Sequence, residues 1–500
     1  MQTIHGTTAV AVAAAAAMAL AGCVPAVQVA PSGPATKTAV DAALPAAFSG
    51  PAPATATPAT AADVAWRAFF TEPALAGLIE AALANNQELN ILLQEVEAAK
   101  NEARARSGEY LPSVGLRVGA GTEKVGRYTR NGAVEDQLEI KPGEEFPEPL
   151  GQYGVAAEVS WEVDIWGRLR KATKAAVLRY AATEEGRQFM VTRLVAEIAR
   201  TWYELVALDR RLELIERTIG IQENALAVVR LQKVSGRATE LAVRRFEAEV
   251  LRNRTRQFEV RQQITEAENR LNYLAGRYPE PIDRSAGDFE GARTRPIEAG
   301  SPADLLAHRP DVRRAELELE AAALDVQAAR ARFYPALGIN GAVGLESFEL
   351  GSLTSTPASV LYGLSADLTM PLLNRRAIEA AFRTANARQI QALYEYQRTL
   401  LAAFVEVSNQ MARIRNLDSS YTAKERQVEA LGESIELADR LFRSARADYL
   451  EVLLTQREAL ESRIELVEIK QQQLDARVTA YQALGGGVEP APAAPPPHGG

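Results

Sequence analysis

The chain repeats itself, and this internal duplication constrains the fold more than any other feature of the sequence. A helical stretch that ends at Pro112 recurs in a stretch that ends at Pro335, 223 residues later. Farther on, Tyr153 and the residues after it recur at Tyr362, 209 residues later. The separation falls because the first copy carries a longer loop, roughly residues 123 to 150. Two copies of one folding unit are predicted; the alternative is a chance similarity of Ala-, Glu- and Arg-rich helices.

Two segments in each copy alternate between apolar residues and small, polar or acidic ones, which is the period of a β-strand. They are residues 113–120, 153–164, 336–345 and 362–370. Such faces are typical of a transmembrane β-barrel, although a soluble sandwich alternates in the same way. Four strands cannot close a barrel, since the smallest hold about eight, and lipid tolerates no open strand edge. Several chains would therefore have to share one barrel.

Long helices are predicted for the rest of each copy. Neither residues 150–278 nor residues 372–489 contain a Pro. Apolar residues recur there at the 3/4 spacing of coiled coils. Residues 167–233 as one helix would reach about 100 Å at about 1.5 Å per residue. Turns at Gly236 and near Ala445 would fold each long helix back on a shorter one. We expect a mainly α fold with a small β part.

The first residues have the pattern of a leader. Residues 9–20 form an uncharged run of 12, shorter than the roughly 20 residues that a membrane span needs, so a signal peptide is predicted. The sequence Leu-Ala-Gly-Cys follows and ends at Cys23, the only Cys of the chain. This spacing resembles the bacterial lipobox, in which the Cys becomes the lipidated N-terminus. The alternative is a buried free Cys behind a cleaved signal peptide.

Composition and motifs argue against several classes of protein. Fifty-six basic and 64 acidic residues give a net charge of -8, whereas a nucleic-acid binder would show a basic excess. With 3 His and 1 Cys, no metal site and no cofactor are expected. Residues 119–121 lack the third Gly of a dinucleotide fingerprint, and neither a P-loop nor a GxSxG motif occurs. We therefore expect no enzyme and no catalytic residue.

A set of motifs in a fixed order points to one family. They are the lipobox, Trp66 with Phe70, Leu83 to Asn86, Trp161 to Arg168, and Asp448 to Leu453. Together, over about residues 60 to 485, they resemble the TolC/OprM outer-membrane efflux family, and most of all its NodT-type lipoproteins of tripartite, RND-type systems. The resemblance implies a homotrimer whose twelve strands close one barrel in the outer-membrane lipid and whose helices form an α-barrel across the periplasm. It also implies a periplasmic adaptor and an inner-membrane pump that supplies the energy for exporting drugs or toxic compounds.

The resemblance implies two groups of site residues. Acidic residues on the strands would line the barrel lumen and favour cationic solutes, or would simply be solvated: Glu158, Glu162, Asp164 and Asp367. At the periplasmic aperture, three copies of Glu451 would form an acidic ring, and Arg446 and Arg457 would offset its charge. Leu454 stands where the family commonly has a second acidic residue, Asp. The alternative is that Glu451 is simply an exposed residue on a helix surface. Gly236, Arg237 and Ala445 would lie at the tips that contact the adaptor.

The chain is predicted to divide into six segments. It comprises a signal peptide (1–22), a lipid-anchored tether (23–73) that is extended from about residue 24 to 63, repeat 1 (74–276), a linker (277–300), repeat 2 (301–484) and a disordered tail (485–500). A rival interpretation is a lipid-anchored periplasmic adaptor or structural coiled-coil protein. That rival would share the anchor and the long helices, but it would not need two pairs of strands with one apolar face.

Overall fold

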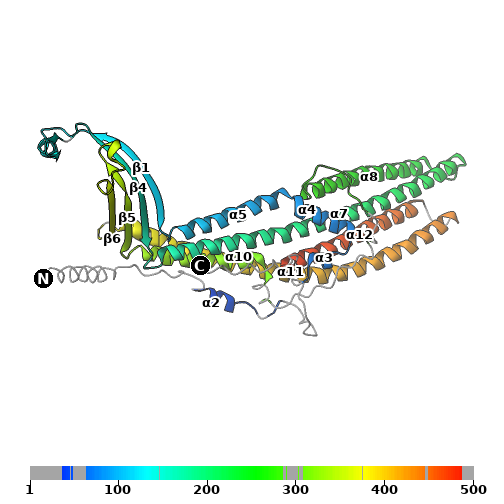
Figure 1. Cartoon of the computed structure of the whole chain (residues 1–500). Coiled ribbons are helices and arrows are strands. Elements are labelled where there is room, and N and C mark those ends of the chain that lie inside the picture. The colour runs from blue at the N-terminus through cyan, green and yellow to red at the C-terminus, as the bar shows by residue number, and fades with distance from the viewer. Residues whose placement is uncertain are drawn as a thin grey trace. The chain divides into compact units, whose positions relative to one another are not determined.

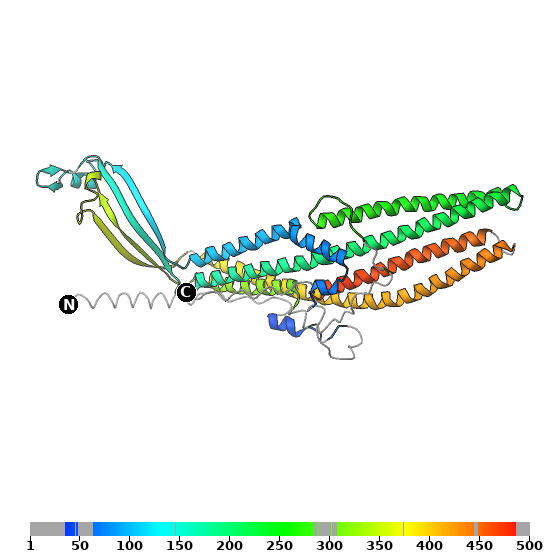
Figure 2. The ribbon, with the colours of Figure 1, turned by 45° about the vertical axis from the view of Figure 1, so that its right-hand side comes forward.

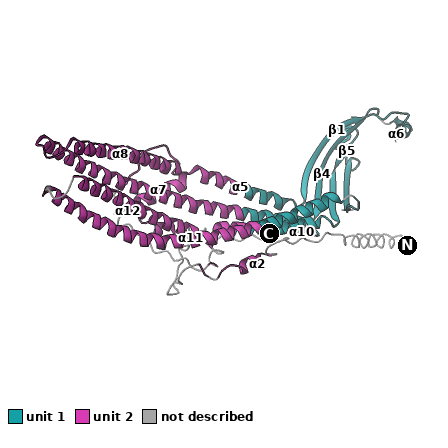
Figure 3. Ribbon diagram, turned by 180° about the vertical axis from the view of Figure 1, so that it is seen from behind, with its two compact units in different colours: residues 1–35, 98–180, 317–393 teal, residues 36–97, 181–316, 394–500 magenta. Residues whose placement is uncertain are grey.

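The computed structural model describes residues 36–45, 47–48, 64–145, 147–284, 289, 302, 308–373, 375–444 and 449–486. These residues are mostly helical, with one four-stranded and one two-stranded sheet (Figure 1). The predicted fold class, long helices with a small β part, is confirmed. The chain divides into two compact units (Figure 3). Unit 1 comprises, among the described residues, 98–180 and 317–393, and unit 2 the remainder.

The four-stranded sheet belongs to unit 1. Its strands are β1 (Ser113–Glu123), β4 (Leu150–Val163), β5 (Ala336–Ser347) and β6 (Val360–Thr369). They pair antiparallel in the order β1-β4-β5-β6, so each repeat supplies one hairpin and the hairpins meet at β4 and β5 (Figure 2). The period-2 alternation predicted all four strands, because most residues on one face of each strand are apolar.

Each repeat places its helices in the same order around its hairpin. In repeat 1 they are α5 (Gln87–Gly108), α7 (Arg168–Val234) and α8 (Glu240–Leu274), and in repeat 2 α10 (Pro310–Ala331), α11 (Arg376–Arg443) and α12 (Tyr449–Ala483). The 67 residues of α7 form one helix, as predicted. After it the chain turns at Gly236, whose φ of 71° lies in the left-handed region that favours glycine. The matching turn near Ala445 lies outside the described residues.

Apolar side chains hold the α7–α8 hairpin together near its turn. In unit 2, Leu226 and Val229 of α7 are buried against Val243 and Phe246 of α8, and Leu453 of α12 joins the same cluster. The 3/4 spacing of the sequence places these side chains on one stripe of each helix. Next to the sheet, unit 1 has a smaller core in which Phe333 packs edge-on against Phe382, with ring centroids 5.9 Å apart.

Both repeats close on themselves through equivalent hydrogen bonds in unit 2. Asn86, just before α5, donates from Nδ2 to the carbonyl oxygen of Leu274, the last residue of α8, at 2.9 Å. Arg309, just before α10, donates from Nη1 to the carbonyl oxygen of Ala483, the last residue of α12, at 2.7 Å. Asn86 and Arg309 lie 223 residues apart, and Leu274 and Ala483 lie 209 apart. The duplication therefore extends to single contacts.

Several short elements were not predicted. Within the stretch expected to be a tether, the structure has helices α2 (Lys37–Ala42) and α3 (Trp66–Phe69), followed by α4 (Pro73–Asn85). The expectation of an extended chain from about residue 24 to 63 is therefore wrong at α2, whereas α3 and α4 lie beyond that stretch. In unit 2, Asp41 accepts a hydrogen bond from the Tyr396 hydroxyl at 2.6 Å, and Lys37 lies 3.1 Å from Glu316. Side-chain contacts rather than a long apolar pattern thus hold α2 in place.

The long loop of the first repeat also has structure of its own. It contains helix α6 (Arg130–Glu135) and a two-stranded sheet of β2 (Glu139–Lys141) and β3 (Glu144–Glu145). Thr129 caps α6 by accepting a hydrogen bond from the backbone N–H of Gly132 at 3.2 Å. The corresponding loop of the second repeat has only a short 3₁₀ helix, Leu350–Ser352. The extra residues of the first repeat therefore build a small folded excursion between β1 and β4.

Candidate functional site

The register of the four strands places the apolar residues on one face of the sheet. Leu116 lies opposite Ala157, Ala157 opposite Val343, and Val343 opposite Tyr362. In β1 these apolar side chains are about 70% exposed, with Leu116 at 73%. A contiguous, exposed apolar face on a sheet marks contact with lipid or with another protein.

Both outer edges of this sheet are unpaired among the described residues. β1 hydrogen-bonds only to β4 and β6 only to β5. Every residue of β1 is exposed, and nearly every residue of β6 is. Such an edge presents a row of free N–H and C=O groups that can pair with another strand. The sheet of one chain is therefore built to be extended on both sides.

Three of the predicted lumen carboxylates share the opposite, polar face. Glu162 lies opposite Gly338, and Gly338 opposite Asp367, so these two acidic residues belong to one row across the sheet. Glu158 lies on the same face and is 3.3 Å from the Arg117 guanidinium. Glu162 accepts hydrogen bonds from Arg168 at 2.6 and 2.7 Å. The face is thus acidic but partly compensated by arginine, and its role as a lumen stays a prediction.

The fourth carboxylate, Asp164, lies just beyond the end of β4 and has different contacts. Its side chain accepts hydrogen bonds from the backbone N–H groups of Leu169 at 3.1 Å and Arg170 at 2.9 Å, in the first turn of α7. Only 8% of the side chain is exposed, and Arg170 Nε lies 3.2 Å away. These are the contacts of a helix cap, which satisfies N–H groups that have no partner within the helix. Sequence alternation could not distinguish this role from a strand position.

Tryptophan side chains fasten the helix-proximal end of the sheet. Trp161 donates from Nε1 to the carbonyl oxygen of Tyr110 at 3.0 Å, and Trp166 donates to that of Pro335 at 2.8 Å. The Trp166 ring also stacks on Tyr334, with centroids 4.8 Å apart. Tyr110 and Pro335 belong to the recurring Tyr-Leu-Pro and Tyr-Pro turns between helix and strand. Aromatic side chains at one end of a strand are typical of a membrane interface.

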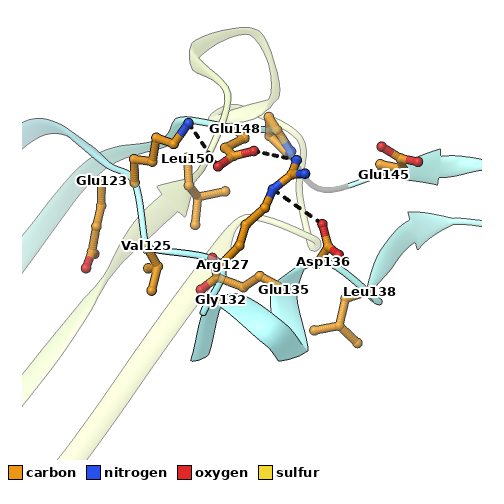
Figure 4. Close-up of a pocket in the computed structure, with 12 residues that line it drawn as sticks. Glu123, Val125, Arg127, Gly132, Glu135, Asp136, Leu138, Glu145, Glu148 and Leu150 are labelled. Carbon is orange, nitrogen blue, oxygen red and sulfur yellow. Dashed lines mark hydrogen bonds and ion pairs between the residues drawn. The ribbon is translucent and has the colours of Figure 1, made fainter. Parts of the chain in front are cut away.

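The folded excursion between β1 and β4 encloses a polar hollow (Figure 4). Glu148 lies between two cations, at 3.1 Å from Lys124 Nζ and 2.9 Å from Arg127 Nη2. Hydrogen bonds from Lys124 and Arg127 hold the pKa of the Glu148 carboxyl below its usual value. Arg127 Nε also lies 3.5 Å from Asp136. Because β1 and β4 join the helices at their other ends, this hollow lies at the end of the sheet away from the helices.

The predicted tip residues of the first hairpin lie in the turn between α7 and α8. Arg237 donates its backbone N–H to the carbonyl oxygen of Gln232 at 2.8 Å, and Gly236 donates to that of Lys233 at 3.0 Å. Thr239 caps α8 by accepting from the N–H of Ala242 at 3.2 Å. Ala445 and Arg446 lie outside the described residues. A role of these turns in adaptor contact stays a prediction.

The remaining aperture residues lie in the first turns of α12. Glu451 is exposed, and Leu454 is 38% exposed, whereas Leu453 between them is buried against the first hairpin. Arg457 buries its Nε without a hydrogen-bond partner among the described residues. Glu451 and Leu454 therefore share the side of α12 that does not face the α7–α8 core. Whether that side forms an aperture stays a prediction.

The described part of the chain lacks two features. No helix there combines the length and the apolar character that crossing a membrane requires. Nor does this part of the chain gather three or more His, Cys, Asp or Glu side chains in a way that could hold a metal ion. Cys23 and its predicted acyl anchor lie outside the described residues.

Comparison with known proteins matches both repeats. The sequence model of the family described as "Outer membrane efflux protein" matches residues 78–277 and 302–486. The chain is 29% identical to "Pyoverdine export outer membrane protein OpmQ" of Pseudomonas putida, over 85% of this chain and 88% of the relative. It is 25% identical to "Cation efflux system protein CusC" of Escherichia coli, again over 85% of this chain and 88% of the relative.

A solved structure shares the fold. The open state of the MtrE outer membrane channel of Neisseria gonorrhoeae superposes with a TM-score of 0.78 at 24% identity, covering 89% of this chain and 96% of that one. The family match extends over most of the chain and includes both hairpins of the sheet and both pairs of long helices. The protein is thus an outer-membrane component of efflux, and its chain belongs to the outer membrane efflux protein family.

Proposed function

We propose that three copies of the chain close one barrel in the outer membrane and continue as a helical conduit through the periplasm. The observation that carries this proposal is the four-stranded sheet with an exposed apolar face and two unpaired edges. Lipid leaves no water to pair those edges, and four strands are too few to close on themselves. Three such sheets supply the twelve strands of an ordinary outer-membrane barrel.

The conduit would be passive and would export small molecules. A periplasmic adaptor would dock it to an inner-membrane pump, and the pump would choose the cargo and supply the energy. Two relatives are named for the export of pyoverdine and the efflux of cations, which supports small solutes as the cargo class. We assign the chain no chemistry of its own, because Glu158, Glu162 and Asp164 are engaged with arginines and backbone N–H groups rather than with a nucleophile.

We also propose that diacylglyceryl and acyl groups on Cys23 anchor the chain to the membrane. The chain's only Cys falls at the position that the lipobox requires. Palmitate labelling of the wild type and of Cys23→Ala tests this. We expect label only in the wild type; equal labelling of both proteins, or of neither, would contradict the anchor without affecting the barrel.

The mass of the detergent-extracted protein tests the conduit first, followed by conductance in a planar lipid bilayer. We expect three chains per particle and discrete single-channel steps. A monomer or dimer without conductance would reject the channel and favour the lipid-anchored adaptor instead. Deletion of the gene in its host, with exported compounds measured in the medium, would then identify the cargo.

A further inference from the structure

The junctions between helices and sheet differ in charge between the two repeats. In repeat 1, three arginines near the end of α5 and the start of α7 pair with carboxylates. The pairs, all within unit 1, are Arg106 with Glu109 at 3.0 Å, Arg168 with Glu162 at 2.6 Å and Arg170 with Asp164 at 3.2 Å. The positive charges of these arginines are therefore balanced within the chain.

The carboxylates of these pairs have no acidic counterpart in repeat 2. Shifted by the 223 or 209 residues that separate the repeats, Glu109, Glu162 and Asp164 correspond to Arg332, Pro371 and Leu373. One carboxylate is thus replaced by a cation and two by apolar residues. The junction of repeat 2, where α10 leads into β5 and β6 leads into α11, is therefore more positive than that of repeat 1.

Four arginines at this second junction form no ion pair among the described residues: Arg330, Arg332, Arg375 and Arg376. All but Arg375 are exposed. Arg375 stacks its guanidinium on the Phe333 ring, with Cζ 4.9 Å from the ring centroid. Its Nε and Nη2 atoms are buried and have no hydrogen-bond partner within the described part of the chain. Because buried donors are nearly always paired, we expect an acceptor here that this part of the chain does not supply.

Two exposed leucines adjoin the arginines. Leu372 and Leu373, between the end of β6 and the start of α11, are 63% and 87% exposed. Leu372 continues the alternation that places Leu368 on the apolar face of β6. Trp166 lies at the same junction, since it donates to the carbonyl oxygen of Pro335. Exposed apolar side chains beside arginines and Trp are typical of the boundary between lipid tails and headgroups.

We propose that the junction of repeat 2 binds the phosphate group of a phospholipid; this rests on the proposed barrel in the membrane. Arg332, Arg375 and Arg376 donate to the phosphate, and Leu372 and Leu373 contact the acyl chains. Arginine suits this ligand because its N–H groups match the oxygens of a phosphate in pairs. Stacking uses the face of the Arg375 guanidinium and leaves its N–H edge for such an acceptor.

The contrast between the repeats fixes the number of sites. An anionic ligand gains little at the junction of repeat 1, whose arginines already face carboxylates, and most at the junction of repeat 2. A trimer should therefore hold three such lipids and not six. The exposed leucines favour a lipid over free phosphate, because an inorganic anion would leave them in water.

Native mass spectrometry of the full-length protein, extracted in detergent, tests the site with three probes. Dioleoylphosphatidylglycerol supplies the phosphate and the acyl chains, dioleoylglycerol supplies only the chains, and inorganic phosphate supplies only the anion. We expect saturable binding of three dioleoylphosphatidylglycerol molecules per trimer and much weaker binding of the other two probes.

Variants that remove charge locate the lipid. Arg375→Gln with Arg376→Gln should weaken binding roughly 30-fold, since each arginine at a lipid surface contributes about a factor of 5. Arg332→Gln with Arg376→Gln should do the same; it leaves the stacking of Arg375 intact and so guards against a folding defect. Arg415→Gln with Arg426→Gln is the matched control, because both residues are exposed and lie about 60 to 75 Å farther along α11 at about 1.5 Å per residue.

The outcomes separate the lipid site from the conduit. Lipid binding that weakens in both double variants and not in the control supports the proposal. Binding that is unchanged in the variants, or equally tight for dioleoylglycerol or for inorganic phosphate, overturns it. A wild-type trimer that binds no lipid, because a neighbouring copy covers the arginines, also overturns it. The same spectra give the mass of the particle: a trimer without the site leaves the conduit standing, whereas a monomer or dimer rejects the conduit even if lipid binding follows the arginines.

Discussion

Arg309 occupies in the second repeat the position that Asn86 occupies in the first, and each side chain closes its repeat by donating to the last carbonyl of the returning helix. Arg309 has the larger side chain and makes additional contacts. Its side chain is 7% exposed and also contacts Asp311 at 2.7 Å and Glu406 at 2.8 Å. The second repeat is thus fastened by a buried ionic group where the first uses an amide.

This difference predicts unequal costs of truncation. Arg309→Ala should lower the free energy of unfolding by roughly 3 kcal/mol, because it leaves two partly buried carboxylates without their partner. Asn86→Ala should cost about 1–2 kcal/mol, because it removes a buried hydrogen bond and the cap of α5, in which Asn86 Oδ1 accepts from the backbone N–H of Leu89 at 3.0 Å. The melting temperature of the extracted protein measures both, with Arg67→Ala, from a half-exposed pair with Glu80, as the control. Equal melting temperatures for the two variants would contradict the assignment.

The glycines with positive φ are predicted to differ in their tolerance of a side chain. A Cβ on Gly276 would lie 2.3 Å from the carbonyl oxygen of Asn85, whereas one on Gly236 would meet nothing within 4 Å. Gly236→Ala should therefore cost only the left-handed conformation, about 1–2 kcal/mol. Gly276→Ala must also displace backbone and should cost roughly 2–5 kcal/mol. Equal losses of thermal stability in the two variants would show that the contact at Gly276 does not matter.

The cap on α7 predicts which substitution of Asp164 is tolerated. Asp164→Ala removes both acceptors of the first helical turn and should cost about 1–2 kcal/mol. Asp164→Asn keeps an acceptor oxygen and should retain most of that stability. Unfolding temperatures of the two variants test this. If both substitutions left stability unchanged but altered conductance, Asp164 would be a lumen residue and not a cap.

If the polar face of the sheet lines the pore, removing a negative charge and removing a positive charge from it should change the ion selectivity in opposite directions. Asp367 makes no ion pair within the described part of the chain, so Asp367→Asn should weaken the preference for cations. Arg117, 76% exposed on the same face, should give the opposite result, and Arg117→Gln should strengthen it. Reversal potentials in a potassium chloride gradient measure both. Unchanged potentials for both variants would mean that this face does not line the pore.

A half-buried carboxyl in α7, that of Glu185, should make stability depend on pH. Burial, and then the nearby Glu184, raise the pKa of Glu185, while Arg313 of α10 opposes the shift. A raised folded pKa means that stability is complete below the unfolded pKa and is lost as pH rises through the folded value. Glu185→Gln should therefore melt above the wild type at pH 7.5 and together with it at pH 4.

Two features of the structure make Glu185→Gln a clean test. Arg313 lies 2.5 Å from Glu316 and so keeps an anionic partner in the variant. Glu184→Gln is the matched control, because Glu184 accepts from Arg187 at 2.6 Å. A lower melting temperature for Glu185→Gln at pH 7.5 would show that the carboxylate stabilises the fold.

The sequence predicted the elements whose patterns are long. The alternation of residues 153–164 and the uninterrupted apolar spacing from 167 to 233 extend over enough residues to exclude other periods. The duplication then supplied the order of the elements. Helices α2 and α6 were missed because 6 residues cannot display a helical period, although Thr36 and Thr129 carried a capping signal. Both threonines accept from the backbone N–H three residues on.

The roles of individual side chains were harder to predict from the sequence. Asp164 continues the alternation of its strand, so only the backbone could show that the strand ends at Val163 and the carboxylate turns to the helix. The contacts of Asn86 and Arg309 join residues about 190 or 170 positions apart, and a single sequence gives no pairing information over such distances.

The unpaired edges of the sheet also have a genetic consequence. In the proposed trimer every edge would depend on a strand from another copy, so one faulty chain would disturb a barrel that also contains normal chains. A cell that makes an altered chain beside the normal one would build mixed rings, and a fault confined to β1 or β6 would reach most of them. Such a fault would act as a dominant trait, whereas loss of the whole gene would be recessive.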